Sequence, residues 1–295
     1  MCAEGRGLAR NGYPLLTSRS EHGSAGRHLR APMSCRCFHG RALAYFKTMS
    51  ETGDFMGTVD IHRATLETCG EASGTVVVID VLRAFTTAGF AFDAGAEAIT
   101  LVSEVREAYA LREAHPDWLI TGEVGGLPVQ GFDFSNSPGG FVGEDLRGRR
   151  LVQRTSSGTQ GVVRSTGAAN RVAASLCCAR ATAAYLDRLQ PDRVTMVITG
   201  SHPEGLGDED QACADYLEGL IRERPVDLEG IRKRVRSAQA AQRFIDPEQR
   251  AFSLEDLEYA LDVDRFGFAM VVRKEGAYDV MRAVDVCGGP RKVHG

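Results

Sequence analysis

The feature that most constrains the fold is an alternation of short β-branched runs with helical segments. The run TVVVIDV, residues 75–81, is typical of a strand buried on both faces, and a helical segment, 83–96, follows it. The same alternation continues through residues 97–115, 117–124, 149–164, 170–189 and 192–224. Strands that alternate with helices favour a mainly parallel sheet covered on both sides. The predicted fold class is therefore α/β, with a mainly parallel or mixed sheet in three layers, α/β/α.

The rest of the chain extends this pattern without a visible break. Helical stretches are predicted near 228–243 and 253–261, followed by strands at 268–274 and 278–285. No internal repeat or linker is visible, so residues 49–295 are predicted to form a single α/β domain. A body of roughly 240 residues could also divide into two.

The first 48 residues differ in composition from the body. They hold eight Lys or Arg against two acids, with much Gly and Ser and no sustained periodicity. This composition predicts a disordered N-terminal extension outside the fold. An organelle transit peptide has the same composition, and a start assigned too early, with Met49 or Met56 as the true start, explains it equally well.

The body is acidic, which limits its partners. Residues 49–295 carry 27 of the 35 Lys and Arg but 37 of the 39 Asp and Glu, a formal charge of −10. Such a body repels nucleic acid and acidic membranes, and an anionic ligand would need a metal ion or clustered arginines. No apolar run approaches the roughly 20 residues of a membrane span. Eight cysteines without a C-x-x-C pair argue against zinc and indicate reduced thiols, so a cytoplasmic location is expected.

The first candidate site residues stand at the end of the strand near 75–81. Ligands of such sheets bind beyond the carboxyl ends of the strands, where VVVIDVLRAFTT places Asp80 and then Arg83. A carboxylate there can coordinate a hard cation, and an arginine can hold a phosphate through two hydrogen bonds. The alternative is an internal Asp–Arg pair that only orders the turn.

A second candidate is the glycine-rich segment GEVGGLPVQGFDFSNSP. It carries Glu123, then Asn136 and Ser137 before a proline. Two glycines after Glu123 allow positive φ, and Asn-Ser-Pro favours a turn that presents its side chains outward. Such a loop is more often functional than a short one. The alternative is a solvated loop in which Asp133 forms an Asx turn.

A third candidate is the loop VQRTSSGTQGVV, which joins a buried strand to a helix. Arg154 and the small residues at 155–159 place a guanidinium, hydroxyl groups and exposed backbone N–H groups together. These donors can converge on an oxyanion. The simpler alternative is an ordinary strand-to-helix turn with a hydroxyl N-cap.

The fourth candidate is GSHPEGLGDEDQ, which opens a helix with three acids. Asp208 with Gln211 fits a capping box, and acids in a first turn favour the helix dipole. Three carboxylates exceed what a cap needs, so Glu209 and Asp210 are candidates for a magnesium site. His202 could act as a general acid or base, but a loop histidine without function is the simpler interpretation.

Taken in chain order, these motifs resemble those of the 2-phosphosulfolactate phosphatase (ComB) family. The resemblance runs from about Val76 to Arg273 and rests on the order and spacing of VVVIDVLRAFTT, GEVGGLPVQGFDFSNSP, QRTSSGTQGVV and GDEDQACADYLEG. It implies an α/β, magnesium-dependent phosphatase that hydrolyses 2-phosphosulfolactate to sulfolactate and phosphate, a step of coenzyme M biosynthesis. One departure is Ser157, which stands where the family often has Asn and shortens one polar contact.

The resemblance and the residues together predict the roles at the site. We expect Asp80, Glu123 and one or both of Glu209 and Asp210 to bind Mg²⁺, directly or through water. Asp80, Arg83 and Arg154 are the predicted catalytic residues, and the predicted substrate-binding residues are Asn136, Ser137, Thr155, Ser156, Ser157, Gly158 and Thr159.

The expected ligand is a small anionic phosphorylated molecule, and the chain is compatible with a homo-oligomer. Two rival functions stay open: a phosphatase of another phosphorylated hydroxy acid, and a non-catalytic anion-binding protein. Whether water or an enzyme group attacks the phosphoryl group also stays open.

Overall fold

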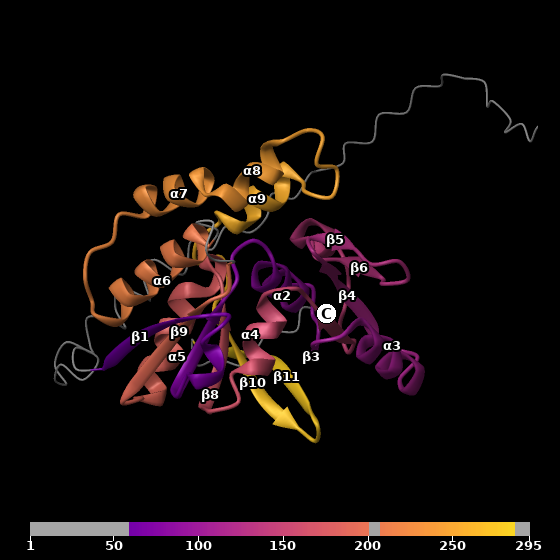
Figure 1. Cartoon of the computed structure of the whole chain (residues 1–295), viewed down its shortest axis with the longest axis horizontal. Coiled ribbons are helices and arrows are strands. Elements are labelled where there is room, and N and C mark those ends of the chain that lie inside the picture. Colours follow the sequence, from indigo (N-terminus) through magenta and orange to yellow (C-terminus); the bar gives the residue numbers. More distant parts are fainter. Residues whose placement is uncertain (1–58, 201–206, 287–295) are drawn as a thin grey trace, which may run out of the picture. The chain divides into compact units, whose positions relative to one another are not determined.

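The computed structural model describes residues 59–200 and 207–286 of the chain (Figure 1). All of them belong to one compact unit that spans Asp54–Gly295. The predicted N-terminal extension, 1–48, and His202 lie outside the described residues, and the domain boundary stays a prediction. None of the helices in the described ranges is long and apolar enough to cross a membrane. The four described cysteines, Cys69, Cys177, Cys178 and Cys213, are buried and free.

Strands and helices alternate through most of the described chain. The strands are β1 (Asp60–Thr65), β2 (Gly74–Ile79), β3 (Ala98–Val102), β4 (Leu119–Val124), β5 (Leu127–Pro128), β6 (Phe134–Ser135), β7 (Arg150–Arg154), β8 (Ala168–Ala174), β9 (Arg193–Ile198), β10 (Phe268–Glu275) and β11 (Tyr278–Asp285). The α-helices are α2 (Ala84–Asp93), α3 (Val105–Ala114), α4 (Gly158–Arg164), α5 (Ala179–Leu189), α6 (Asp208–Ile221), α7 (Leu228–Ser237), α8 (Gln239–Ile245) and α9 (Leu254–Ala260). Short 3-10 turns cover Cys69–Glu71, Pro138–Phe141 and Leu176–Cys178.

The strands form one mixed, mostly parallel sheet. Its order is β1-β9-β2-β8-β10-β11-β3-β7-β4-β5, and β6 pairs with β4. Strands β1, β9, β2 and β8 are mutually parallel, as are β3, β7 and β4. The antiparallel pair β10–β11 lies between these two groups. The prediction of an α/β fold with a mainly parallel sheet is therefore confirmed.

The sheet curls so that its two parallel groups face each other across helices α2 and α4. Three antiparallel ladders separate the groups, so β2 and β7 run in opposite senses along the sheet. In a flat sheet their carboxyl ends would lie at opposite edges. One core cluster nevertheless joins Val78 of β2, Leu151 of β7 and Phe85 of α2. The side-chain amide of Gln153 also donates to the carbonyl of Ala84 over 2.9 Å, so the ends of β7 and β2 meet at the start of α2.

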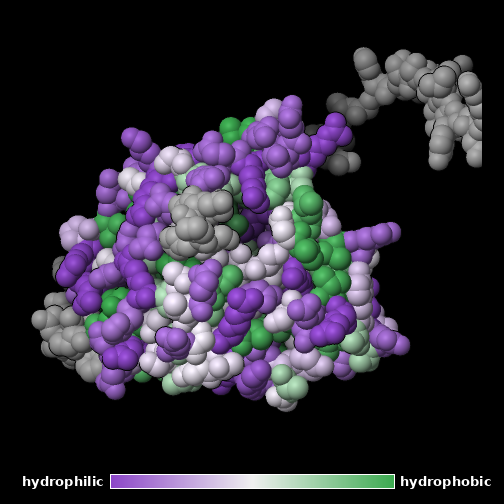
Figure 2. All heavy atoms as spheres, viewed as in Figure 1, coloured by the Kyte–Doolittle hydropathy of each residue, from purple (hydrophilic) through white to green (hydrophobic). Residues whose placement is uncertain are grey.

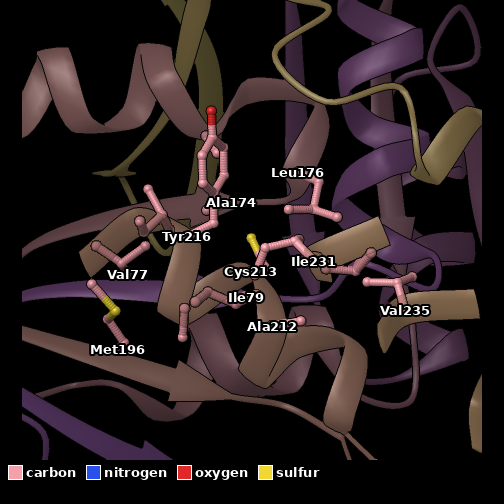
Figure 3. Close-up of a cluster of buried hydrophobic side chains, with 14 of the residues drawn as sticks. Val77, Ile79, Ala174, Leu176, Met196, Ala212, Cys213, Tyr216, Ile231 and Val235 are labelled. Atoms are coloured by element: carbon pink, nitrogen blue, oxygen red, sulfur yellow. The ribbon is translucent and has the colours of Figure 1, made fainter. Parts of the chain in front are cut away.

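Helices cover both faces of the strands, which confirms the three layers. Val77 and Ile79 of β2 pack with α6 and α7 in one cluster (Figure 3). Val76 and Val78 pack on the opposite face with α2 and α4. Helix α3 covers the outer side of β3, β4 and β7. Because β2 is buried on both faces, its near-continuous run of β-branched residues is what such a position requires.

Two details of the fold differ from the sequence-based expectation. The helical stretch predicted near 228–243 is two helices, because Ala238 is extended with ψ of 145°. The break lets Val235 of α7 and Phe244 of α8 both reach the same core. Strands β1, β5 and β6 were not predicted, since β1 has a mixed polar pattern and the other two have only two residues each.

Candidate active site

Asp80 lies directly after β2 and is the centre of the site. Its side chain is buried, with 6% exposure, and its Oδ1 accepts a hydrogen bond from the backbone N–H of Ala84 over 2.9 Å. Gly158, the first residue of α4, donates its backbone N–H to the same carboxylate. A Cβ on Gly158 would lie 2.8 Å from Oδ2 of Asp80 and 2.7 Å from Cβ of Ala84. Only glycine fits there, and Gly158 therefore brings the hydroxyl loop against Asp80.

The first turn of α6 brings two more buried carboxylates to the end of β2. Asp210 accepts hydrogen bonds from the backbone N–H groups of Val81 (2.7 Å) and Gly200 (3.1 Å) and from the hydroxyl of Thr199 (3.2 Å). Glu209 is also buried, and its Oε2 has no hydrogen-bond partner in the part of the chain that the structure describes. Asp210 therefore ties β2 to β9, whereas Glu209 keeps one carboxylate oxygen unsatisfied.

The predicted capping box of α6 is wrong. The N-cap is Gly207, with φ of 106° and no side-chain hydrogen bond to the helix end. Asp208 instead forms an ion pair with Arg234 of α7, 2.6 Å between Nη2 and Oδ1. A glycine in the left-handed region allows the chain to enter α6 at an angle that a capping aspartate could not adopt without strain.

Burial of several carboxyl groups close together raises their pKa values. Burial, helped by the charges of Glu123 and Glu209, raises the pKa of Asp80 to about 7 despite the lowering effect of the hydrogen bonds from Ala84 and Gly158. Burial, then the charges of Glu209 and Asp80, raises the pKa of Asp210 well above its ordinary value. Burial also raises the pKa of Glu209. This acidic corner, defined as Asp80, Glu209 and Asp210, carries negative charge that only a proton or a cation can offset.

Glu123, at the end of β4, links the glycine turn to the hydroxyl loop. Its Oε1 accepts from the backbone N–H of Ser156 over 2.5 Å. Its Oε2 accepts from the backbone N–H of Gly126 over 2.5 Å and from the hydroxyl of Ser156 over 3.1 Å. Three donors therefore hold this carboxylate, although its charge still reaches Asp80.

The acidic corner fits a magnesium ion that keeps several water ligands. Within 59–200 and 207–286, no three His, Cys, Asp or Glu side chains form a ready set of metal ligands. Mg²⁺ commonly uses only one or two protein carboxylates together with water and substrate oxygens. Asp80 and Glu209 suit that role best, because Glu123 and Asp210 each accept three hydrogen bonds from the protein.

The hydroxyl loop, residues 155–159, satisfies most of its polar groups internally. Thr159 Oγ1 donates to the carbonyl of Thr155 (2.9 Å) and accepts from its backbone N–H (2.9 Å), and Thr155 Oγ1 accepts from the N–H of Thr159 (3.0 Å). Both threonines are buried. Ser157 is the N-cap of α4 but makes no side-chain capping bond. The threonine pair therefore shapes the loop, and the hydroxyl N-cap expected as the simpler alternative is absent.

Arg154 carries a positive charge that no carboxylate in the described ranges neutralises. Its Nε donates to the carbonyl of Ser103 (3.0 Å), and its Nη1 donates to the carbonyl of Glu123 (2.7 Å) and the hydroxyl of Ser156 (3.3 Å). The side chain is only partly exposed. A guanidinium fixed by neutral acceptors beside a helix start is well suited to bind an oxyanion.

Arg83 forms an internal ion pair, but with a partner that the sequence does not indicate. Its Nη1 lies 2.9 Å from Oδ2 of Asp256 in α9, and both side chains are buried. The guanidinium also donates to the carbonyls of Ala251 (3.1 Å) and Gly126 (3.3 Å), and it stacks on Phe252 at 4.7 Å from the ring centroid. The expected alternative of a local pair between Asp80 and Arg83 is therefore wrong, because Arg83 pairs with Asp256 of α9.

Asp256 also holds the turn that carries Asn136 and Ser137. Its Oδ1 accepts from the hydroxyl of Ser137 over 2.7 Å and from the backbone N–H of Gly139 over 3.2 Å. Asn136 is buried, and its Oδ1 lacks a hydrogen-bond partner among the described residues. Asp133 accepts from the backbone N–H of Ile120 over 2.7 Å. No local signal in the sequence separates buried Asp256 from its exposed neighbour Glu255, so Asp256 was not predicted.

Comparison with known proteins identifies the family of this chain. Residues 61–275 match the family described as 2-phosphosulpholactate phosphatase. A protein of Bacillus subtilis (strain 168) named probable 2-phosphosulfolactate phosphatase is 34% identical over 210 residues, 70% of this chain and 91% of that protein. Proteins with the same name from Carboxydothermus hydrogenoformans and Synechocystis sp. are 39% identical over 152 residues and 37% identical over 169 residues. These matches cover 50% and 57% of this chain and 60% and 70% of the two relatives.

The matched region contains the whole site. Asp80, Glu123, Arg154, Glu209 and Asp256 all lie within residues 61–275. The resemblance noted from the motifs is therefore confirmed. The chain belongs to the 2-phosphosulpholactate phosphatase family and is a phosphoric monoester hydrolase, an enzyme with a small phosphorylated substrate.

Proposed function

We propose that this enzyme hydrolyses 2-phosphosulfolactate to sulfolactate and inorganic phosphate in a magnesium-dependent reaction. The observation that carries the proposal is that Glu123 connects the acidic corner with an unneutralised guanidinium. The charge of Glu123 acts on buried Asp80, whose pKa is raised to about 7. Arg154 donates to the carbonyl of Glu123 and has no carboxylate partner among the described residues. A phosphate bound between a cation at the acidic corner and the guanidinium of Arg154 would neutralise the charges of both. The names of the relatives supply the substrate.

In the proposed complex, Asp80 and Glu209 hold Mg²⁺. When bound there, Mg²⁺ would polarise a phosphoryl oxygen and offset the charge that develops as the ester bond breaks. Asp210 keeps the ends of β2 and β9 together through Val81 and Gly200, and the charge of Glu209 acts on Asp80. Glu123 fixes the glycine turn and the hydroxyl loop on the other side.

The phosphoryl group would lie against Arg154 and the start of α4. Ser157 and Gly158 begin this helix, and Gly158 already directs its backbone N–H toward a carboxylate oxygen of Asp80. N–H groups and a guanidinium that the fold already holds in place stabilise negative charge without having to reorganise during the reaction. Phosphate binding by Arg83 and substrate binding by Asn136 and Ser137 stay predictions, as do a cytoplasmic location, a homo-oligomer and a role in coenzyme M biosynthesis.

The test is phosphate release by the purified full chain. We would supply 2-phosphosulfolactate, phosphoglycolate and phospholactate, each with Mg²⁺ and with EDTA. Release that requires Mg²⁺ and is fastest with the sulfonated ester would support the proposal. Faster release from another ester would reassign the substrate, and tight binding of sulfolactate without any release would show an anion-binding protein instead.

A further inference from the structure

Arg243 of α8 lies beside the glycine turn that joins β4 to β5. A Cβ on Gly126 would lie 3.6 Å from Nη1 of Arg243 and 2.7 Å from Cζ of Phe252. The backbone N–H of Gly126 donates to Oε2 of Glu123 over 2.5 Å. A single turn residue therefore lies between Arg243 and the carboxylate that borders the acidic corner.

The ring of Phe252 lies near two guanidinium groups with different charge balance. Arg83 is 4.7 Å and Arg243 is 5.6 Å from the ring centroid. Arg83 is buried and neutralised by Asp256 at 2.9 Å. Arg243 is exposed and has no ion-pair partner within residues 59–200 and 207–286. Contact with the ring favours one position of this guanidinium while its charge stays available.

The guanidinium of Arg243 is also accessible to a small solute. It lines a surface cavity of about 380 Å³ together with Gln242, Ile245, Asp246 and Gln249. By contrast, Arg236 of the neighbouring helix pairs with Glu258 at 3.0 Å. On this segment, Arg243 is thus a cation that is fixed beside the site and open to solvent.

Two unneutralised guanidinium groups therefore flank the same turn. Arg154 reaches it through the carbonyl of Glu123, 2.7 Å from Nη1, and Arg243 reaches it at Gly126. A substrate with two strongly acidic groups could bridge them. In 2-phosphosulfolactate the sulfonate lies one bond farther than the carboxylate from the carbon that carries the phosphate.

We propose that Arg243 binds the sulfonate of the substrate while the phosphate lies at Arg154, and that this contact sets the preference for a sulfonated ester. The inference rests on the proposed function. An arginine can hold a sulfonate through two parallel hydrogen bonds, as it holds a phosphate or carboxylate. Arg243 is therefore a specificity-determining residue for the substrate's second acidic group.

The test compares Arg243→Gln with a matched control, Arg250→Gln. Arg250 is exposed on the same segment, and its backbone N–H donates to the carbonyl of Glu248. We would measure phosphate release from 2-phosphosulfolactate, from phospholactate, which lacks the sulfonate, and from 2-phosphooxyethanesulfonate, which lacks the carboxylate. In Arg243→Gln we expect KM for both sulfonated esters to rise about 10- to 100-fold, as for loss of a charged hydrogen bond. KM for phospholactate should change less than about twofold, and Arg250→Gln should match the wild type.

Other outcomes overturn the proposal. An equal rise in KM for all three esters would show a general effect on the site, and a rise for phospholactate without one for 2-phosphooxyethanesulfonate would assign Arg243 to the carboxylate. Absence of phosphate release in the wild type would instead reject the proposed function. Calorimetric binding of sulfolactate still decides in that case: weaker binding by Arg243→Gln supports the sulfonate contact, and equal binding contradicts it.

Discussion

The acidic corner and the hydroxyl loop both come from sequence motifs that stand out as candidate sites, but they differ in how far the protein satisfies their polar groups. In the hydroxyl loop, Thr155 and Thr159 bond to each other. In the acidic corner, Glu209 keeps an unpartnered buried oxygen among the described residues, and the pKa of Asp80 is raised to about 7. One region is internally satisfied, whereas the other needs a proton or a cation from outside.

This difference distinguishes residues that stabilise the shape of a site from residues that are available to bind a ligand. A satisfied hydrogen-bond network contributes rigidity and stability, and its members gain little by exchanging partners for a ligand. Buried carboxylates held close together cost free energy in the absence of a counter-ion, and such cost is typical of functional positions. We therefore propose that Thr155 and Thr159 support the site and that the acidic corner is its reacting side.

The largest expected effect is that of Asp80→Asn. An asparagine can still accept the hydrogen bond from Ala84, so the fold should persist while the negative charge is lost. We expect kcat/KM for phosphate release to fall by at least about 100-fold, together with a large loss of Mg²⁺ affinity. Asp145→Asn, on an exposed side chain paired with Arg147, is the control and should keep full activity. Unchanged turnover in Asp80→Asn would remove this carboxylate from the mechanism.

The same carboxylate should make the metal-free protein less stable as pH rises. Its pKa is raised from 3.8 to about 7 on folding, so the folded state binds the proton more tightly than the unfolded chain. The resulting stabilisation is fully present below about pH 4 and is lost as pH rises to about 7, at most about 4 kcal/mol. Urea unfolding with EDTA at pH 5 and pH 8 measures it. Asp80→Asn should show a smaller pH dependence, and a wild-type protein more stable at pH 8 than at pH 5 would contradict the assignment.

Parts of the fold that depend on local residue patterns could be predicted from the sequence. Long strands with both faces buried, such as β2, and amphipathic helices such as α5 were predictable because each pattern depends on local residues. The order of the strands in the sheet was not predictable, since β10 and β11 pair between the two parallel groups. That pairing joins residues far apart in the chain and leaves no local periodic signal.

The candidate site residues could likewise be predicted only where a local sequence pattern marks them. Asp80, Glu123 and Glu209 stand out as candidates because polar residues at strand ends or in a helix's first turn break an apolar pattern. Asp256 was missed because its importance comes from burial beside Arg83, a tertiary contact across 173 positions of the chain. The catalytic role of Arg83 stays a prediction, and the ion pair that neutralises it depends on that same distant partner.

A smaller effect is expected where the two regions touch, at Gly158. An alanine Cβ there would lie 2.7 Å from Cβ of Ala84 and 2.8 Å from Oδ2 of Asp80, closer than real contacts allow. We expect Gly158→Ala to lower the free energy of unfolding by about 1–3 kcal/mol and to reduce activity by displacing the carboxylate. Gly70→Ala has room, with its nearest atom at 3.8 Å, and serves as the control. Equal activity and stability in the two variants would show that Gly158 and Asp80 are not in contact.

The smallest effect, and the sharpest test of the support role, is that of Thr159→Val. Valine has nearly the same shape but cannot accept the hydrogen bond from the backbone N–H of Thr155, which stays buried. The free energy of unfolding should fall by about 1–2 kcal/mol, because a buried donor is left unsatisfied. KM for 2-phosphosulfolactate should stay close to the wild-type value, since the hydroxyl is already engaged within the loop. A large rise in KM at unchanged stability would instead place Thr159 in contact with the substrate, and the hydroxyl loop would then belong to the reacting side.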